Sequence, residues 1–308
     1  MPDTESIHTI DDLADWSPDH PALAVIGHPV KHSVSPAMHN AALDAMRADG
    51  QALQGWHYHK FDIPAERLGE ALPLFFKAGF QGLNLTIPHK VEALRWITSV
   101  DPSVAAMGAV NTLIRDDRGY RGNNTDGFGL SRAIQVHLGL TLGERPVILL
   151  GAGGAARAAA VQCLRDGCPS LHIGNRSRER LNPLLDLLRP VAGQTPVHGF
   201  TFDNPPTDIP PDALIINATA AGLKAGEASP FSLEALSGDV RVYDMVYNPP
   251  VTPLMQDAQS RGFAHANGLS MLVWQGVRSL ELWTGLPVPA DIMTAAAEQA
   301  LQPPLNHG

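Results

Sequence analysis

Short apolar runs alternate with amphipathic stretches along the first part of the chain. The runs predict strands at residues 21–27, 55–61 and 80–86, and the amphipathic stretches predict helices at residues 35–47, 63–78 and 88–97. Ser35 and Pro36 suit the start of the first helix, with serine as its N-cap and proline at its first helical position. Alternating strands and helices predict an α/β layer structure for this part of the chain.

A second series of helices and strands begins at residue 128. The pattern predicts helices at residues 128–138 and 155–165 and strands at residues 146–150, 170–174, 213–217 and 240–246. Between the two series, residues 109–115 and 119–123 favour a hairpin. Helical spacing returns from Gly268 onward. Residues 1–20 form an extension with helical spacing at 9–16, and residues 302–308 are expected to fray.

Length and composition narrow the class of protein. At 308 residues the chain exceeds one usual core, so two domains are expected. A net charge of −9 without a stripe of Lys and Arg argues against nucleic acid or an anionic membrane as partner. The acidic start lacks the features of a secretory signal, and Cys163 and Cys168 are the only cysteines. Together these features predict a cytoplasmic protein with reduced thiols.

Lys90 and Asp126 each follow a predicted strand in a polar, turn-forming segment. A lysine and a carboxylate at the ends of neighbouring strands can form a proton-transfer pair. Lys90 falls in the first turn of its predicted helix, where the helix dipole disfavours a cation, so a purely structural role is less favoured. For Asp126 the alternative is an N-cap of helix 128–138.

A glycine-rich turn joins the strand at residues 146–150 to the helix at residues 155–165. Its residues are Gly151, Ala152, Gly153, Gly154 and Ala155, followed by Ala156. This spacing fits G-x-G-x-x-A, in which the glycines permit a tight turn and let backbone approach a pyrophosphate at a helix N-terminus. The turn therefore predicts a dinucleotide site, and the alternative is a tight turn that binds nothing.

The next strand ends in a basic segment that bears on the choice of nicotinamide cofactor. Its residues include Asn175, Arg176, Ser177 and Arg180. NAD sites place an acidic residue at such a position to hold the ribose 2′-hydroxyl, whereas guanidinium groups bind a 2′-phosphate. The segment favours NADP over NAD, unless it is only a solvated helix start.

Polar residues in the first half predict a small polar substrate. Ser33 and Ser35 stand at a predicted helix N-terminus, which suits a substrate carboxylate. Neutral hydrogen-bonding side chains at the ends of predicted strands suit a polyhydroxylated ligand; they are Asn84, Thr86, Asn111 and Asn124. His28, His32, His39 and His89 cluster only in sequence, without carboxylate or cysteine ligands nearby, so no metal site is expected.

These segments together resemble the shikimate/quinate dehydrogenase family. The matching segments are residues 32–36 with 39–40, 84–90, 109–112, 122–127, 151–155, 175–177, 217–219, 247–249 with 252–254, and 268–275. They follow the family's order and cover nearly all of the chain beyond residue 20. Ala220 and Ala221 depart from the Pro or Ser often found after Asn-Ala-Thr, and Leu223 stands where Met or Ile is common.

The resemblance implies roles for individual residues. It implies that Lys90 and Asp126 are the catalytic pair, and that Ser33 and Ser35 hold the substrate carboxylate. It implies that the ring hydroxyls are bound by Thr86, Asn111, Tyr247 and Gln275. On the cofactor side it adds Thr219 and places Met245, Gly268 and Met271 near the nicotinamide.

The resemblance also implies an architecture and an activity. The expected domains are an extension at 1–20, an α/β substrate-binding domain at 21–127 with returning C-terminal helices at 268–308, and a Rossmann-type NADP-binding domain at 128–267. The implied activity is NADP-dependent, reversible reduction of 3-dehydroshikimate to shikimate by a monomer or homodimer. Two alternatives stay open, namely a quinate/shikimate dehydrogenase that uses NAD and a catalytically silent NADP-sensing module.

Overall fold

The computed structural model describes residues 6–16, 20–224 and 226–302. The chain divides into two compact units: unit 1 comprises Met1–Thr125 and Gln275–Gly308, and unit 2 comprises Asp126–Trp274. Unit 1 is therefore discontinuous in sequence, and the segment that forms unit 2 is inserted into it. These bounds leave the ligand of each domain a prediction.

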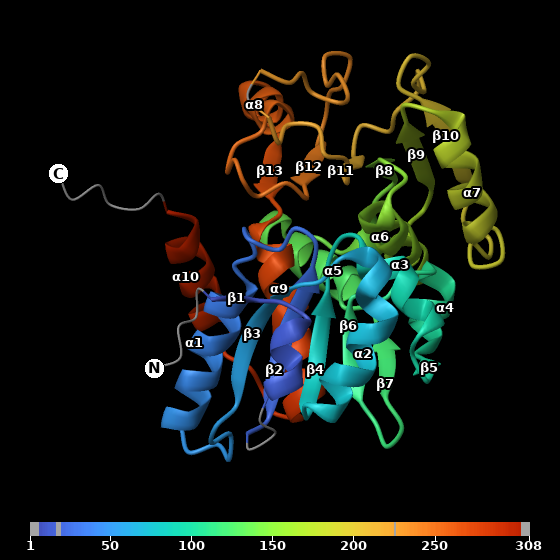
Figure 1. The fold of residues 1–308 in the computed structure, drawn as a ribbon. Coiled ribbons are helices and arrows are strands. Elements are labelled where there is room, and N and C mark those ends of the chain that lie inside the picture. The colour runs from blue at the N-terminus through green and yellow to red at the C-terminus, as the bar shows by residue number, and fades with distance from the viewer. Residues whose placement is uncertain (1–5, 17–19, 225, 303–308) are drawn as a thin grey trace. The chain divides into compact units, whose positions relative to one another are not determined.

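Unit 1 is built on a seven-stranded mixed sheet (Figure 1). In spatial order its strands are β1 (Ile7–His8), β3 (His57–Asp62), β2 (Ala22–Gly27), β4 (Phe80–Leu85), β6 (Thr112–Arg115), β7 (Tyr120–Asn123) and β5 (Ser99–Val100). Strand β2 is buried at every position, as its unbroken apolar sequence predicts. Strands β6 and β7 pair antiparallel, which confirms the predicted hairpin, while β2, β3 and β4 run parallel.

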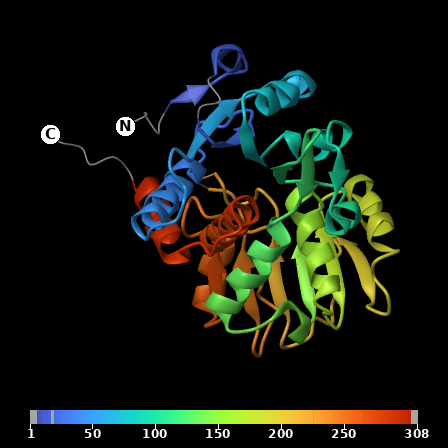
Figure 2. The same ribbon diagram turned by 90° about the horizontal axis from the view of Figure 1, so that it is seen from below.

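Helices cover the sheet of unit 1. They are α1 (Ser35–Ala48), α2 (Leu68–Lys77), α3 (His89–Glu92), α4 (Pro102–Met107), α10 (Ala290–Leu301) and the second part of α9 (Leu269–Thr284). Helices α1 and α10 pack side by side, which Figure 2 shows as the adjacent blue and red helices. On the other face of the sheet, Phe61, Phe75 and Phe80 meet edge to face in a core that includes α2.

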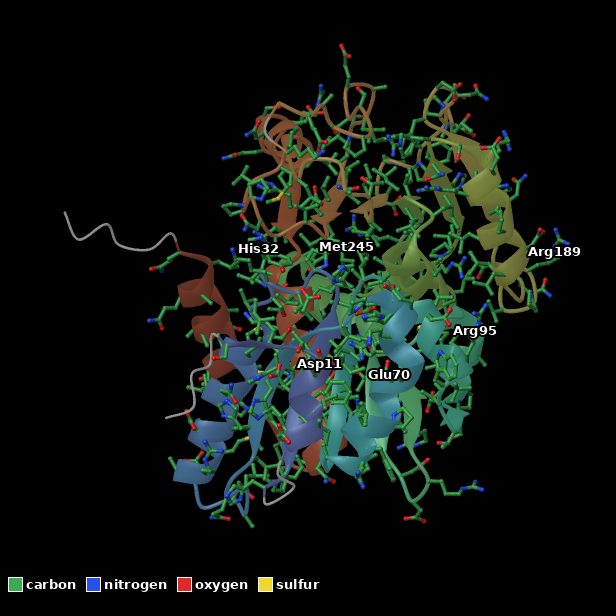
Figure 3. All side chains as sticks on the ribbon, viewed as in Figure 1. Asp11, His32, Glu70, Arg95, Arg189 and Met245 are labelled. Carbon is green, nitrogen blue, oxygen red and sulfur yellow. The ribbon has the colours of Figure 1, made fainter. Side chains whose placement is uncertain are left out.

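The N-terminal extension is part of unit 1. Strand β1 pairs in parallel with β3, and a 3-10 turn at η1 (Asp11–Asp15) buries Leu13 in the core beside α2. Arg67 forms ion pairs with Asp11 at 3.3 Å and Glu70 at 2.8 Å; Figure 3 labels both acids. The helical turn predicted at residues 9–16 is thus confirmed in 3-10 form. Residues 1–5, 17–19 and 303–308 of the predicted termini lie outside the described residues.

Unit 2 contains a six-stranded parallel sheet. In spatial order its strands are β10 (Val197–Thr201), β9 (Leu171–Asn175), β8 (Val147–Leu150), β11 (Leu214–Asn217), β12 (Arg241–Asp244) and β13 (Ala264–Asn267). Its α-helices are α5 (Asp126–Leu138), α6 (Gly154–Arg165), α7 (Arg178–Leu188), α8 (Pro253–Ser260) and the first part of α9. The first strand, β8, lies centrally and the order reverses beside it, as in a Rossmann-type fold. The predicted α/β class is confirmed.

Some predicted elements differ from the structure. The helix predicted at residues 88–97 is only the short α3, and the chain tightens into a 3-10 turn at η3 (Ala93–Arg95). Helix α5 begins at Asp126, two residues before the predicted start. Two further 3-10 turns lie at η2 (Ala65–Arg67) and η4 (Leu142–Glu144). In the part of the chain that the structure describes, no helix is long and apolar enough to cross a membrane.

Candidate functional site

The loop after β2 carries the two predicted carboxylate-binding serines. The backbone N–H of Ser35 donates to the Ser33 hydroxyl at 3.4 Å, and Ser35 is buried at 7% exposure. Val34, not Ser35, occupies the N-cap position, and no side chain caps this end of α1. The predicted serine N-cap is therefore wrong by one residue. His32, labelled in Figure 3, is exposed in the same loop.

Backbone hydrogen bonds hold Thr86 and Lys90 near the end of β4. The Thr86 N–H donates to the Ile26 carbonyl at 3.0 Å, and the His89 N–H donates to the Thr86 carbonyl at 2.9 Å. The Lys90 carbonyl accepts from the Val110 N–H at 2.7 Å. Val110 directly precedes Asn111. This hydrogen bond therefore joins the segment that carries Thr86 and Lys90 to the segment that carries Asn111. Helix α3 is short and gives Lys90 only a weak helix dipole. The dipole therefore gives less support than expected for the view that Lys90 is not purely structural.

Asn111 lies in a buried polar network of unit 1. Its side-chain oxygen accepts from the Thr125 N–H at 2.8 Å and from the Thr112 hydroxyl at 2.9 Å. Its side-chain nitrogen donates to Gln275 Oε1 at 3.4 Å. Asn84 belongs to the same network, because its side-chain nitrogen donates to the Thr112 hydroxyl at 3.2 Å. Two predicted hydroxyl-binding residues, Asn111 and Gln275, are thus brought together from distant parts of the sequence.

Two aromatic rings lie behind this network. His39 is fully buried and stacks on Tyr58 with ring centroids 4.0 Å apart, and its Nδ1 lies 2.8 Å from the Ser35 carbonyl. Burial lowers the pKa of His39 to about 4, so its ring is neutral at physiological pH. The Tyr58 hydroxyl donates to Asn84 Oδ1 at 2.8 Å, and burial raises the pKa of Tyr58. These contacts fix the loop end of α1 to the amides at the strand ends.

Asp126 is the first residue of α5 and of unit 2, and it is buried at 7% exposure. It follows Thr125, whose N–H is bonded to Asn111. Asp126 is thus covalently one residue from the network of unit 1. The structure places it inside the first turn of the helix, not at the N-cap considered as its alternative. Asn124, its other polar neighbour in sequence, donates to the Ala109 carbonyl at 3.0 Å.

The glycine-rich turn of unit 2 lies between β8 and α6. Gly151 has a φ of +117°, and an added Cβ there would lie 2.9 Å from the Ala218 carbonyl oxygen. At Gly153 and Gly154 an added Cβ would meet no atom within 4 Å. Gly151 is therefore required by the fold, whereas Gly153 and Gly154 leave open space beside the first N–H groups of α6. Free N–H groups at a helix N-terminus with open space beside them are what a pyrophosphate site requires.

The basic segment after β9 leads into α7. Ser177 is the N-cap of α7, and the Asn175 side-chain nitrogen donates to the Ser177 carbonyl at 2.9 Å. Arg176 and Arg180 are exposed, as expected for side chains that bind a ligand's phosphate. The arrangement brings Asn175, Arg176 and Ser177 together directly at the carboxyl end of β9, the strand next to β8.

Buried polar groups support the remaining cofactor-side residues. The Thr219 N–H and hydroxyl both donate to Asn217 Oδ1, at 3.0 Å and 2.7 Å. Asn217 donates to Asp244 Oδ1 at 2.9 Å, and Asp244 also accepts from the Thr252 hydroxyl at 2.6 Å. Burial raises the pKa of Asp244, although these hydrogen bonds oppose the rise. Asn217 and Asp244 were not predicted as site residues, and the only signal for Asn217 was its place in Asn-Ala-Thr.

Met245 and Gly268 lie against one another in unit 2. The Met245 N–H donates to the Asn217 carbonyl at 2.9 Å, and a Cβ on Gly268 would overlap the Met245 carbonyl. Figure 3 labels Met245. Met271 and Tyr247 are half-buried, and burial raises the pKa of Tyr247. Among the described residues, no group of three or more His, Cys, Asp or Glu side chains could hold a metal ion.

Two family models match separate stretches of the sequence. Residues 25–113 match the family model described as the shikimate dehydrogenase substrate binding domain. Residues 268–298 match the model described as the shikimate 5′-dehydrogenase C-terminal domain. The chain is also 37% identical to shikimate dehydrogenase (NADP(+)) of Geobacter metallireducens over 282 residues, which is 91% of this chain and 96% of that protein.

Solved structures agree with these matches. The shikimate 5-dehydrogenase of Thermus thermophilus, solved with NADP(H) and shikimate, is 35% identical with a TM-score of 0.79, covering 91% of this chain and 100% of that one. The quinate dehydrogenase of Corynebacterium glutamicum, solved with NAD, is 28% identical with a TM-score of 0.80, covering 91% and 99%. Similarity of fold alone therefore does not separate shikimate from quinate or NADP from NAD.

Proposed function

The chain belongs to the shikimate dehydrogenase family, and from this premise we propose that it catalyses the NADP-dependent, reversible reduction of 3-dehydroshikimate to shikimate. It is an oxidoreductase acting on a CH–OH group, in the pathway that leads through chorismate to the aromatic amino acids. The observation that carries the proposal is the pairing of Asn111 with Gln275 beside Thr86 and Lys90 in unit 1. Such neutral amides and hydroxyls suit a polyhydroxylated ring.

We assign the cofactor site to unit 2 and the substrate site to unit 1. We propose residues 128–267 for NADP and residues 21–127 with 268–308 for substrate, a division that the bounds of the two units support. Gly151, Ala152, Gly153, Gly154 and Ala155 would hold the pyrophosphate, and Asn175, Arg176, Ser177 and Arg180 the 2′-phosphate. Met245, Gly268 and Met271 would line the nicotinamide, and Thr219 would contribute to the same cofactor site. The open space at Gly153 and the exposed Arg176 fit such a cofactor.

When bound, NADPH supplies the hydride for the ketone. The chain's own residues then handle binding and the proton. Ser33 and Ser35 hold the carboxylate, while Thr86, Asn111, Tyr247 and Gln275 hold the ring hydroxyls. Lys90 and Asp126 are the proposed catalytic pair, which supplies the proton to the oxygen that gains negative charge.

Substrate choice follows from the loop that carries Ser33 and Ser35. Quinate has a hydroxyl on the carbon that bears the carboxylate, and that carbon is tetrahedral. The Ser35 N–H holds the Ser33 side chain in place and Ser35 is buried, so the loop offers little room for the additional group. A buried polar group without a partner costs about 1–3 kcal/mol. We therefore expect a preference for shikimate of roughly tenfold or more in kcat/KM.

The test is a set of initial rates for shikimate and quinate, each with NADP and with NAD. We expect the combination of shikimate and NADP to be fastest, and we expect Ser33→Gly to narrow the gap between shikimate and quinate. Comparable rates with quinate or with NAD would move the chain to the quinate/shikimate branch. Binding of NADP without turnover of either acid would instead support a silent NADP-sensing module.

We further propose that the protein acts in the cytoplasm as a monomer or homodimer, with small-molecule ligands as its partners. Both cysteines are unpaired and buried, in keeping with a reducing compartment. Burial raises the pKa of the Cys168 thiol to about 11, and Asp166 contributes to the rise. Light scattering on the purified chain would distinguish a monomer from a dimer.

A further inference from the structure

Ser279 lies on α9, one helical turn after Gln275, and is fully buried. Its hydroxyl donates to the Gln275 carbonyl at 2.9 Å. A hydroxyl carries one proton and two lone pairs, so the Ser279 oxygen can only accept from its other neighbours. One of them is Asn84, whose side-chain nitrogen donates to it at 3.0 Å.

Two threonine hydroxyls bridge Ser279 to Asn111. The Thr112 hydroxyl lies 2.9 Å from Ser279 Oγ and 2.9 Å from Asn111 Oδ1. The Thr125 hydroxyl lies 3.2 Å from Ser279 Oγ and 3.3 Å from Asn111 Oδ1. Each threonine has one proton to donate, so each can serve either oxygen. Ser279 thereby joins α9 to β4, to β6 and to the segment before α5.

The network also fixes which way the Asn111 amide faces. A backbone N–H can only donate, so the Thr125 N–H, at 2.8 Å, must face Asn111 Oδ1. The Asn111 nitrogen then donates to the Thr125 hydroxyl at 3.0 Å and to Gln275 Oε1 at 3.4 Å. The contact with Gln275 joins the Asn111 amide to a residue of α9. The orientation of both amides thus depends on the rotation of α9 that Ser279 holds.

Burying these groups is not needed for packing alone. Apolar side chains would fill a helix–sheet contact without the desolvation cost of these hydroxyl and amide groups. Elsewhere on the same helix, the Thr284 hydroxyl also donates one turn back, to the Leu280 carbonyl at 2.8 Å. Thr284 is not part of the network around Asn111. Ser279 and Thr284 therefore both donate to the backbone carbonyl one turn earlier, but only Ser279 also bonds to the polar network around Asn111.

We propose that Ser279 is a positioning residue that sets Asn111 and Gln275 in the orientation that binds the ring hydroxyls of the substrate. This inference rests on the function proposed above. Ser279 acts through the two amides and the rotation of α9. Its removal should therefore weaken substrate binding while leaving proton transfer by Lys90 and cofactor binding in unit 2 intact.

The test compares Ser279→Ala with Thr284→Ala in the full-length chain, with shikimate and NADP as the varied substrates. We expect Ser279→Ala to raise the KM for shikimate roughly tenfold, the factor that corresponds to about 1.4 kcal/mol. The KM for NADP and kcat should stay within about twofold. Thr284→Ala should lower the melting temperature comparably and leave the KM for shikimate unchanged. Equal effects of the two variants on that KM would overturn the proposal.

A double-mutant cycle with Gln275→Ala separates positioning from general damage. If Ser279 acts through Gln275, adding Ser279→Ala to Gln275→Ala should cost clearly less than it costs alone. Fully additive losses would contradict the proposal. If Ser279→Ala does not fold, Ser279→Cys replaces it, since a thiol is a weaker donor and acceptor and should give a smaller rise in KM.

Failure of this inference and failure of the proposed function give different results. If the unmutated chain does not reduce NADP with shikimate, the proposed function fails and the role of Ser279 fails with it. If the unmutated chain is active and Ser279→Ala keeps its KM for shikimate, only the positioning role is excluded.

Discussion

Unit 1 gathers side chains at the end of β4 and the start of β6, whereas unit 2 presents backbone where β8 ends. In unit 1, amides and hydroxyls such as Asn84, Asn111 and Thr112 bond to one another. In unit 2, the turn at Gly151 and Gly153 offers N–H groups and open space instead of side chains. The difference between the two units corresponds to a difference between their proposed ligands. A ring with many hydroxyls needs directional side chains, and a pyrophosphate needs close backbone.

The two designs should also respond differently to substitution. In the side-chain network most polar groups have two or more partners, so one substitution removes part of the binding energy. A backbone site has no side chain to remove, and it is damaged by adding atoms that the turn cannot accept. The four predictions that follow test this difference, from the largest expected effect to the smallest.

Lys90→Ala tests whether one residue of unit 1 carries chemistry beyond the shared network. We expect turnover to fall by about 10²–10⁴-fold, as is typical when a positioned proton donor is lost. NADP affinity should be nearly unchanged, because Lys90 is in unit 1. Steady-state kinetics and NADP titration measure both quantities. Lys77→Ala, at an exposed position, is the control, and near-normal turnover of Lys90→Ala would remove the lysine from its proposed role.

Arg176→Ala tests a charged side chain on which the cofactor site of unit 2 is proposed to depend. Charge-assisted hydrogen bonds contribute about 1.5–3 kcal/mol each, so the KM for NADP should rise roughly 10- to 150-fold. NAD has no 2′-phosphate and should be little affected. Arg189→Ala, at an exposed residue at the other end of α7 (Figure 3), is the matched control. Equal losses for the two cofactors would show that Arg176 does not discriminate between them.

Gly151→Ala and Gly153→Ala separate fold from binding within the same turn. At Gly151, a φ of +117° and the Ala218 carbonyl both oppose a Cβ, so unfolding should become easier by about 1–3 kcal/mol. At Gly153 the Cβ meets no atom, so stability should hold while the KM for NADP rises. Denaturant unfolding and cofactor titration give the two readouts. A stable Gly151→Ala protein with normal NADP affinity would contradict this account of the turn.

Acid should destabilise unit 1 through the half-buried His59. Burial, with His57 and His8 close by, lowers the pKa of His59 from 6.5 to about 3. Above pH 6.5 the His59 ring is neutral in both the folded and the unfolded protein. As the pH falls from 6.5 toward 3, the ring is protonated in the unfolded protein and stays neutral in the folded protein. Stability is therefore lost on acidification, by roughly 1 kcal/mol between pH 7 and pH 5.5 for this residue.

The variant His59→Phe should reduce that loss, because phenylalanine keeps an aromatic ring beside Trp16 and Phe80 without a titrating nitrogen. Denaturant unfolding at pH 7 and at pH 5.5 gives the comparison, and His137→Gln, at an exposed position, is the control. An unchanged pH dependence in His59→Phe would mean that other groups dominate the acid response.

The sequence predicted the fold class and many of the elements because their signals are local, although it gave no bounds for α7 or α8. Strands β2 and β8 are unbroken apolar runs, strands β4 and β11 are mostly apolar, and each of the four was placed within a residue or two. Strands β1 and β5 have two residues each, too few to show a period, and β13 is only half-buried. Helix α3 was predicted too long because its apolar positions continue into a 3-10 turn.

Within the candidate site, residue type and position along the chain allowed several residues to be predicted, whereas contacts between distant parts of the sequence could not be predicted. Asn84, Asn111 and Thr86 stood out as polar residues at strand ends, and the structure places them there. Nothing local marks Ser279, which meets Thr112 across 167 residues of sequence. Its neighbours depend on how α9 packs on the sheet. The roles of Lys90 and Asp126 were predicted from their place after strands and from family resemblance, and Lys90→Ala tests the role of the lysine.

The insertion of unit 2 into unit 1 has a consequence for biosynthesis. Residues 126–274 form one uninterrupted stretch that can fold as soon as it has left the ribosome, because domains generally fold as units during synthesis. Unit 1 must wait for Gln275 and the residues after it, since α10 packs against α1. The hydroxyls around Ser279 are therefore among the last groups to find their partners. A nascent chain has its glycine-rich turn ready before the neighbours of Asn111 have been translated.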